Sequence, residues 1–477
     1  MPLTVHNTLA KRKQELVSRE PGRIRMYVCG PTVYGYIHVG NARTFVTFGV
    51  IRDYLEYAGY RVDMVSNITD VDDKIIAAAN QEGATAEDIA RRYAQAYFED
   101  LAALGVRRAD HEPRATEYIP QMIALITTLL ERGYAYQVDG DVYYEVRKFA
   151  DYGKLSGRNL DELMAGARVE VDERKRDPLD FALWKAAKPG EPWWDSPWGK
   201  GRPGWHIECS AMSTALLGAE LDIHGGGGEL TFPHHENEVA QSEAATGHSP
   251  FVRYWLHSGH LTVERRKMSK SLGNFFTVRE VLAHYPAQVL RFLFLSTHYR
   301  QQLEFSDGVL DQARSALDRL LIGHEHIERM IGRAESGAAG DGPLQPLEAA
   351  AAAARQAFTE AMDDDFNTPR ALAALFDLVA EAHRLADERF APTRSQGASF
   401  ANALATLKEL AGVLGLTLEP EARADDLAAK LVQILIDARQ AAREARQYGI
   451  ADAIRSRLAA IGIVLEDRPD ATTWRRA

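Results

Sequence analysis

The chain has only two cysteine residues among 477, and each lies in a segment composed like a reactive site. Cys29 ends the run Met-Tyr-Val-Cys-Gly, and Cys209 ends the run Gly-Trp-His-Ile-Glu-Cys. A third segment, Phe-Pro-His-His-Glu-Asn-Glu at 232–238, adds imidazoles and carboxylates. If a helix starts near its proline, His234 and Glu238 share a face while His235 points elsewhere. Two thiolates, an imidazole and a carboxylate form a donor set suited to tetrahedral zinc.

Residue types alone leave an ordinary alternative to the zinc site open. A free cysteine is more often a small buried hydrophobic residue than a metal ligand, and a buried histidine is often only a hydrogen-bonding residue of the core.

Two further segments have the composition of a nucleotide site. His38-Val39-Gly40-Asn41 stands between a predicted strand and a predicted helix, where the first amides of a helix bind phosphate. Lys267-Met268-Ser269-Lys270-Ser271 follows two arginines, which suits the charge that develops on a pyrophosphate leaving group. Each segment alone is also compatible with a surface turn or a solvated basic loop.

The elements around these segments predict an α/β body. Residues 24–30 and 61–67 have strand patterns, and residues 43–57 between them have helical spacing. Such a βαβ unit predicts a parallel sheet, whose strand ends converge on a ligand crevice. Strand patterns return at 220–224 and 254–261.

The chain becomes helical after Gln301, with segments rich in small residues at 336–343 and 391–399 that predict linkers. A last piece covers residues 424–477. We therefore predict an α/β body of about 300 residues, a helical domain and a small C-terminal domain.

Bulk properties predict a protein of the reducing cytoplasm with no membrane segment. The chain is 46% hydrophobic and 26% charged, without an apolar run near the 18 or so residues that a span needs. Two cysteines do not make a disulfide framework. The formal net charge of −11 means that any nucleic-acid partner would need a local basic face.

Several of these segments resemble the cysteinyl-tRNA synthetase family of class I aminoacyl-tRNA synthetases. The resemblance is carried by Tyr-Val-Cys-Gly-Pro-Thr-Val-Tyr at 27–34, Gly-Trp-His-Ile-Glu-Cys-Ser at 204–210 and the histidine-rich segment at 232–238. It extends from Asn7 to Thr-Trp-Arg-Arg at 473–476. Residues 38–41 and 267–271 are similar to the two class I signatures, although Asn41 stands where the general signature has a second histidine.

The resemblance implies a Rossmann-like, doubly wound parallel sheet and four regions along the chain. These regions are a catalytic domain at 1–300 with a connective insertion at about 74–200, a stem-contact or linker region at 301–342, a helical tRNA-binding domain at 343–418, and a small C-terminal anticodon-recognition domain at 424–477.

The resemblance also assigns residues to the site. One zinc ion per chain would lie on Cys29, Cys209, His234 and Glu238, the last either directly or through water. The catalytic residues would be His38, Lys267 and Lys270; ATP, with Mg²⁺, would bind His38, Gly40, Asn41, Gly226 and Lys270; and the amino-acid substrate would bind Thr69, Trp205 and His224.

The activity that the resemblance implies is ATP-dependent ligation of L-cysteine to tRNA(Cys) through cysteinyl-adenylate, with release of AMP and diphosphate, in translation. The expected protein is a cytoplasmic monomer. Serine is nearly isosteric with cysteine, and because hydrophobic pockets separate such pairs by only about 100-fold, we expect zinc to select the thiolate.

Two other functions remain as alternatives. A related ligase could transfer activated cysteine to a small amine, but such enzymes lack a segment like 424–477. A catalytically silent tRNA-binding paralogue would be expected to lose His38, Lys270 or a zinc ligand, and this sequence retains them.

Overall fold

The computed structural model describes residues 2–159, 174–263, 266–267, 276–340, 342–387, 389–418, 424–467 and 472–476. The chain forms two compact units, Met1–Leu418 and Glu419–Ala477. Lys270 and the other residues outside these ranges are not described here.

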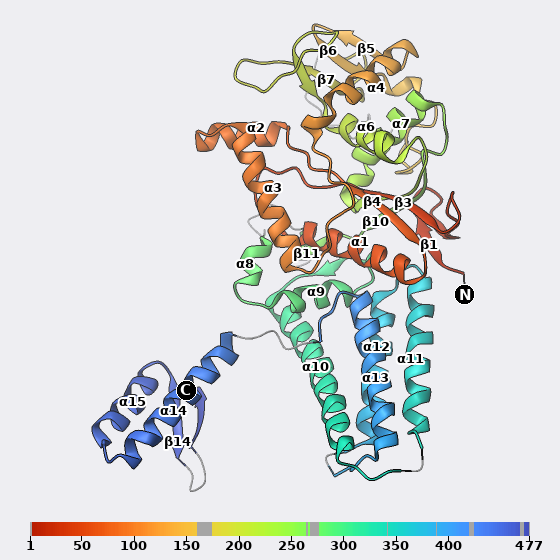
Figure 1. Ribbon diagram of the computed structural model, residues 1–477. Helices are drawn as coiled ribbons and strands as arrows, with labels where there is room; N and C mark the ends of the chain where they lie inside the picture. The colour runs from red at the N-terminus through yellow and green to blue at the C-terminus, as the bar shows by residue number, and fades with distance from the viewer. Residues whose placement is uncertain are drawn as a thin grey trace. The chain divides into compact units, whose positions relative to one another are not determined.

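A four-stranded parallel sheet is the centre of the first unit (Figure 1). Its strands, in the order β10-β9-β3-β4, are β3 (Arg23–Val28), β4 (Arg61–Ser66), β9 (Leu221–Gly227) and β10 (Val252–Ser258). All three strand pairs are parallel. Because parallel strands end at the same edge, the segments after β3, β4 and β9 meet there. The predicted parallel sheet is confirmed.

Alternation along β3 shows that both faces of the sheet are covered. Met26 and Val28 join the core that contains helix α1 (Val39–Tyr57), whereas Tyr27 joins the core that contains helix α6 (Trp205–Leu217). Successive residues of a strand point to opposite faces. Helices therefore lie on both sides, and the sheet is doubly wound, as predicted.

Helix α1 packs closely on the sheet at a glycine of β9. A Cβ atom added to Gly225 would lie 2.1 Å from Cε1 of Phe48, a fully buried residue of α1. Glycine is therefore required here by close approach.

The insertion between β4 and β9 carries its own antiparallel sheet, in the order β5-β6-β7-β8. Its elements are α2 (Asp73–Glu82), α3 (Ala86–Ala103), η1 (Ala115–Tyr118), α4 (Ile119–Glu131), β5 (Ala135–Val138), β6 (Asp141–Tyr144), η2 (Val146–Lys148), β7 (Phe181–Ala186) and β8 (Gly201–Pro203). The 3-10 turn η3 (Gly228–Thr231) and helix α7 (His234–Thr246) then follow β9.

A second small sheet follows β10, in the order β12-β11-β13. Its strands are β11 (Leu261–Val263), β12 (Arg266–Lys267) and β13 (Leu303–Glu304), and helices α8 (Val278–Leu282) and α9 (Ala287–Leu295) lie between β12 and β13 in the chain. The backbone of Lys267 pairs with that of Thr262 across β12 and β11.

Four long helices complete the first unit as a bundle: α10 (Asp307–Glu335), α11 (Gln345–Asp363), α12 (Thr368–Leu385) and α13 (Arg394–Val413) (Figure 1). The linker expected at 336–343 lies between α10 and α11, but the one expected at 391–399 is wrong. Helix α13 begins at Arg394, because Thr393 caps it by accepting a hydrogen bond from the Gln396 amide.

A buried carboxylate joins this bundle to the N-terminal hairpin of β1 (Thr4–Asn7) and β2 (Arg12–Glu15). Asp365, between α11 and α12, accepts hydrogen bonds from the His6 amide at 2.8 Å, the Tyr299 hydroxyl at 2.9 Å and Arg300 Nε at 2.6 Å. Three segments distant in sequence therefore meet on one side chain.

The second unit, described by itself, has a core of Val432, Ile436, Leu458 and Leu465, on which Trp474 packs partly buried. Its elements are α14 (Ala424–Glu444), α15 (Tyr448–Ala460), β14 (Ile463–Asp467) and β15 (Thr472–Arg476), the two strands pairing antiparallel. Within the described ranges of both units, no helix combines the length and apolar character needed to cross a membrane.

We expect Gly225→Ala to destabilise the protein by about 1–3 kcal/mol, the usual cost of inserting a methyl group into a packed core. Urea unfolding of the first unit measures this. Gly412→Ala is the matched control, because it lies in α13 with nothing within 4 Å of the added Cβ. That change should instead stabilise by about 0.5–1 kcal/mol. Equal effects from the two changes would contradict the close approach.

Candidate metal centre and nucleotide cleft

Four side chains from three segments meet at the carboxyl edge of the central sheet. Cys29 directly follows β3, Cys209 lies in α6, and His234 and Glu238 lie in the first two turns of α7. Cys29 Sγ is 3.7 Å from Cys209 Sγ and 3.5 Å from Glu238 Oε1, and His234 Nε2 is 3.1 Å from the same oxygen. All four side chains are buried.

These separations are close to the edges of a tetrahedron around zinc. Zn–S bonds of about 2.3 Å at tetrahedral angles place two sulfur atoms about 3.8 Å apart, and sulfur and oxygen about 3.6 Å apart. The corresponding observed distances are 3.7 Å and 3.5 Å. The residues therefore fit a zinc ion in both donor type and spacing.

The pKa values of the acidic groups show how a cation would change the charge of the cluster. Burial raises the pKa of Cys29 and of Glu238 well above their usual ranges. Burial opposes ionisation of Cys209 as well, but hydrogen bonding from the Cys29 thiol lowers its pKa to about 7. The second carboxylate oxygen of Glu238 is buried without a hydrogen-bond partner among the described residues. A divalent cation would stabilise the ionised forms of all three groups.

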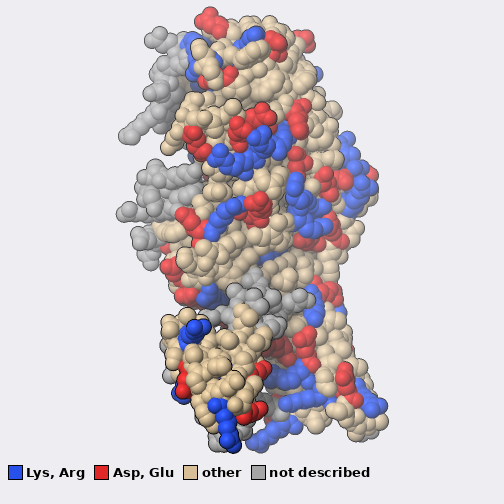
Figure 2. All heavy atoms as spheres, turned by 60° about the vertical axis from the view of Figure 1, so that its left-hand side comes forward, with Lys and Arg blue, Asp and Glu red and all other residues tan. Residues whose placement is uncertain are grey.

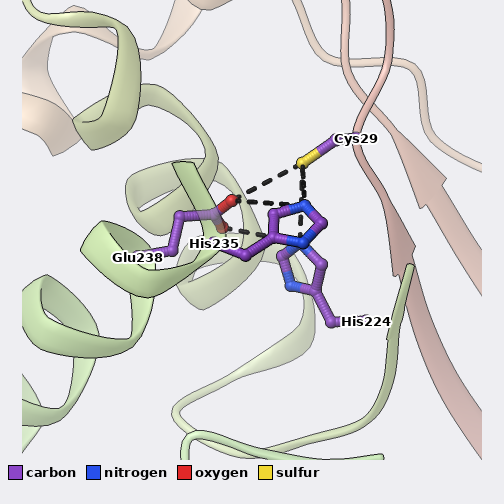
Figure 3. A group of neighbouring side chains, drawn as sticks. All are labelled: Cys29, His224, His235 and Glu238. Atoms are coloured by element: carbon purple, nitrogen blue, oxygen red, sulfur yellow. Dashed lines mark hydrogen bonds and ion pairs between the residues drawn. The ribbon is translucent and has the colours of Figure 1, made fainter. Parts of the chain in front are cut away.

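A second set of donors surrounds Cys29 and Glu238 from another side (Figure 3). His235 Nε2 lies 3.3 Å and His224 Nε2 lies 3.5 Å from Cys29 Sγ. The expectation that His235 points elsewhere is therefore wrong, because residues three apart on a helix are also neighbours, as His235 and Glu238 are. Burial lowers the pKa of both histidines, which are neutral.

Three of the four residues of the first set face a cleft. Cys29, Cys209 and His234 line a cleft of about 240 Å³, and within the described chain the side chains of His224 and His235 do not line it. His235 is instead engaged behind the cluster, with Nδ1 2.8 Å from Nε2 of His257. A ligand entering the cleft would therefore meet the set with two sulfur atoms.

The other end of the cleft is the start of α1, where His38 and Asn41 form a capping box. The Asn41 amide donates to His38 Nδ1 at 3.0 Å, and the His38 amide donates to Asn41 Oδ1 at 3.4 Å. Because Nδ1 accepts, the neutral imidazole carries its proton on Nε2. Asn41 thus completes the cap through its side-chain oxygen, a role that a side chain without an acceptor atom could not perform.

The structure places the other expected residues at different depths. Trp205 and Thr69 line the cleft; the Trp205 ring centroid is 4.3 Å from that of His234, and the Thr69 hydroxyl donates to Glu208 at 2.8 Å. Gly226 is buried beside the second set of donors, where an added Cβ would lie 2.9 Å from His235 Cε1.

For Gly40, Lys267 and Lys270, the structure gives the position of the backbone or no position. Gly40 is the second residue of α1. Lys267 is placed by its backbone, in β12, and Lys270 lies outside the described residues.

Sequence reasoning missed two polar residues that hold the site together. Asn67 Oδ1 accepts from the Gly30 amide at 2.9 Å and lies 3.6 Å from Cys209 Sγ. Its position directly after β4 is a signal that the strand-end rule could have used. His206 Nδ1 lies 3.0 Å from His234 Nδ1, a contact between two helices that no local pattern indicates.

Comparison with known families accords with this fold and cleft. Residues 15–315 match the model described as "tRNA synthetases class I (C) catalytic domain", residues 357–419 match the DALR domain, and residues 424–475 match the cysteinyl-tRNA ligase anticodon binding domain. A structure of Mycobacterium tuberculosis methionyl-tRNA synthetase in complex with methionyl-adenylate has the same fold, with a TM-score of 0.63 at 16% identity, covering 87% of this chain and 94% of that one. The protein is thus of the class I aminoacyl-tRNA synthetase type.

Similarity along the whole chain narrows this class. The chain is 51% identical to the cysteine–tRNA ligase of Heliobacterium modesticaldum, over 100% of both chains. It is 52% identical to that of Symbiobacterium thermophilum, again over 100% of both. The chain therefore belongs to the cysteine–tRNA ligase family.

Two substitutions, one in each donor set, can show which set binds the metal. In cobalt-substituted protein, we expect Cys209→Ser to reduce the sulfur-to-metal charge-transfer absorption by about half, because one of two thiolate ligands is lost. His224→Gln is the control and should leave that absorption unchanged. An unchanged spectrum in Cys209→Ser, together with a changed one in His224→Gln, would assign the metal to the histidine-rich set instead.

Proposed function

We propose that this protein ligates L-cysteine to tRNA(Cys) in two steps, first forming cysteinyl-adenylate and diphosphate from ATP, then esterifying the tRNA and releasing AMP. The observation that carries the proposal is one cleft with sulfur, nitrogen and oxygen donors at one end and the capped start of α1 at the other. The family comparison supports the same activity.

The donor set gives the cleft a preference for sulfur. We propose zinc at Cys29, Cys209, His234 and Glu238, where it would supply a soft-tolerant Lewis acid for the substrate thiolate. Because Cys29, Cys209 and His234 face the cleft, a substrate sulfur can approach the same point. Serine is then discriminated at first binding, where shape alone gives only about 100-fold.

The start of α1 supplies the nucleotide end. The amides of Val39 and Asn41 donate within the protein, so a phosphate would be attracted by the positive end of the helix dipole and by close backbone approach at Gly40. His38 can donate its Nε2 proton to a phosphate oxygen, a role that we assign to it in the first step. We assign Lys267 and Lys270, with Mg²⁺ brought by ATP, to the charge that develops on the departing diphosphate.

The pocket residues are assigned by where they lie. Trp205 lies beside His234 at the wall of the cleft, so we propose that its indole packs against bound cysteine. The Thr69 hydroxyl lies at the floor, held by Glu208. His224 and Gly226 lie deeper and do not line the cleft in this structure, so we assign them to the support of its wall from behind.

Recognition of tRNA is assigned to local surfaces rather than to net charge. On the face drawn in Figure 2, cationic and anionic side chains interleave, so the net charge of −11 does not make this face uniformly negative. The second unit matches an anticodon binding domain, which favours tRNA over a small amine as the acceptor. We assign the contact with unpaired bases to Trp-Arg-Arg at 474–476, because aromatic and cationic residue types suit stacking beside phosphate.

Removal of the metal tests the sulfur preference. Chelator-treated protein should lose cysteine-dependent exchange of pyrophosphate into ATP, and its residual discrimination against serine should fall to about 100-fold or less. Added zinc should restore both. Exchange that is unaffected by chelation, with serine still rejected as before, would contradict the role of the metal.

Truncation after Leu418 tests the division of labour, because the second unit is compact by itself. The shortened chain should retain cysteine-dependent pyrophosphate exchange, since the cleft lies wholly in the first unit. Its kcat/KM for charging tRNA should fall by at least about 100-fold, the loss of a few kcal/mol of binding. Unimpaired charging would refute the role of the second unit.

A further inference from the structure

Arg43 of α1 is a buried cation with an unusual set of partners. It is 1% exposed, and its guanidinium donates to backbone carbonyls, at 2.9 Å to Gly259 and at 2.7 Å to Gln301. Further bonds reach the carbonyls of His260 at 3.2 Å and His298 at 3.3 Å. Burial lowers the pKa of Arg43 to about 10, so that it remains charged at neutral pH.

These carbonyls belong to the two segments that lead into the small sheet. Gly259 and His260 directly precede β11, and the segment 298–301 directly precedes β13. Strand β11 pairs with β13 on one side and, on the other, with β12, which carries Lys267. One side chain of α1 therefore fixes the starting points of both strands that support Lys267.

The segment that follows β12, at residues 276–278, is hydrogen-bonded to the start of α1. The Val39 amide donates to the Phe276 carbonyl at 3.0 Å, and the Val278 amide donates to the Ile37 carbonyl at 3.1 Å. His38 and Thr277 form a β-bridge between them. The segment before β11 is therefore bonded to Arg43 of α1, and the segment after β12 is bonded to the residues around His38 at the start of α1.

We propose that Arg43 is a positioning residue for the nucleotide half of the reaction. It sets where strand β12, which carries Lys267, lies relative to His38 and Asn41, through the carbonyls of residues 259–260 and 298–301 and the pairing of β11 with β12. A guanidinium has five donors in a fixed plane, so a lysine ammonium cannot hold the same carbonyls at once. The inference rests on the proposed function, because it assumes that His38 and Lys267 act on one nucleotide.

A second buried arginine provides a matched comparison. Arg291 of α9 is also 1% exposed, and it donates to the carbonyls of Leu104 at 2.9 Å and Leu414 at 2.8 Å. Burial likewise lowers its pKa to about 10. Its partners lie at the ends of α3 and α13, away from both signature segments. The two residues share burial and bonding but differ in what they hold.

The test measures cysteine-dependent pyrophosphate exchange by full-length, zinc-loaded protein at varied ATP and varied cysteine. Arg43→Lys should lower kcat/KM for ATP by about 10- to 100-fold, the effect of misplacing a group by about 1 Å, with KM for cysteine unchanged. Arg291→Lys should leave the kinetic constants for both substrates unchanged. Thermal unfolding of each variant reports the stability loss that the two changes share.

Ser258→Ala keeps the test decisive if Arg43→Lys does not fold. The Ser258 hydroxyl lies 2.8 Å from that of Thr44, which is a second link between α1 and the segment entering β11. Its loss should lower kcat/KM for ATP in the same direction but less.

The outcomes separate this inference from the function on which it rests. If the unmodified chain lacks cysteine-dependent exchange, the proposed function fails, and the inference fails with it. If the unmodified chain is active, an unchanged kcat/KM for ATP in Arg43→Lys contradicts the positioning role of Arg43 but not the proposed function. A loss of kcat/KM for ATP in Arg291→Lys as large as that in Arg43→Lys has the same consequence. Should Arg43→Lys not fold, an unchanged ATP constant in Ser258→Ala has the same meaning.

Discussion

The desolvation of three acidic groups at one point constrains the rest of this structure. Cys29, Cys209 and Glu238 are taken out of water with their donor atoms within 4.8 Å of one another, where like charges cannot coexist unless a cation compensates them. To bring them together, a strand end, the middle of one helix and the start of another must converge. The parallel sheet supplies this convergence, because its strands end at one edge.

The N-terminus of helix α1 forms the second functional part of the cleft. Asn41 keeps the first amides of α1 ordered by bonding to the backbone of His38, while His38 bonds back through Nδ1. The side chain of Asn41 thus completes the cap, while its backbone amide fixes the tautomer of His38. At this position, the same hydrogen bond that stabilises a helix also decides which ring nitrogen carries the proton.

Local patterns predicted the parallel sheet and singled out Cys29, Cys209, His234 and Glu238, which the structure brings together, but they missed elements that are buried on most sides. Strands β3 and β4 begin with an alternation of exposed or partly exposed and buried residues, whereas helix α1, although predicted, is buried on most sides. Helix α6 was not anticipated, because it is buried around much of its circumference and so lacks an alternation of polar and apolar residues. The start of α13 was mistaken for a linker, since serine and glycine there pack against the bundle.

Long-range contacts could not be predicted for a different reason. The Arg43 guanidinium meets carbonyls more than 200 residues away, and backbone carbonyls carry no mark in a sequence. The expected ligands came from residue types, whereas the partners His206 and Asn67 depend on how helices and strand ends pack.

The carboxylate of Asp365 has a consequence for how the chain is made. It accepts from the His6 amide across 359 residues, which at about 5–20 residues per second separates the two partners by roughly 20–70 s of synthesis. The first strand to leave the ribosome therefore waits for one of the last helical segments of its unit. Until then its edge is exposed, so the newborn chain is most prone to mispairing during that interval.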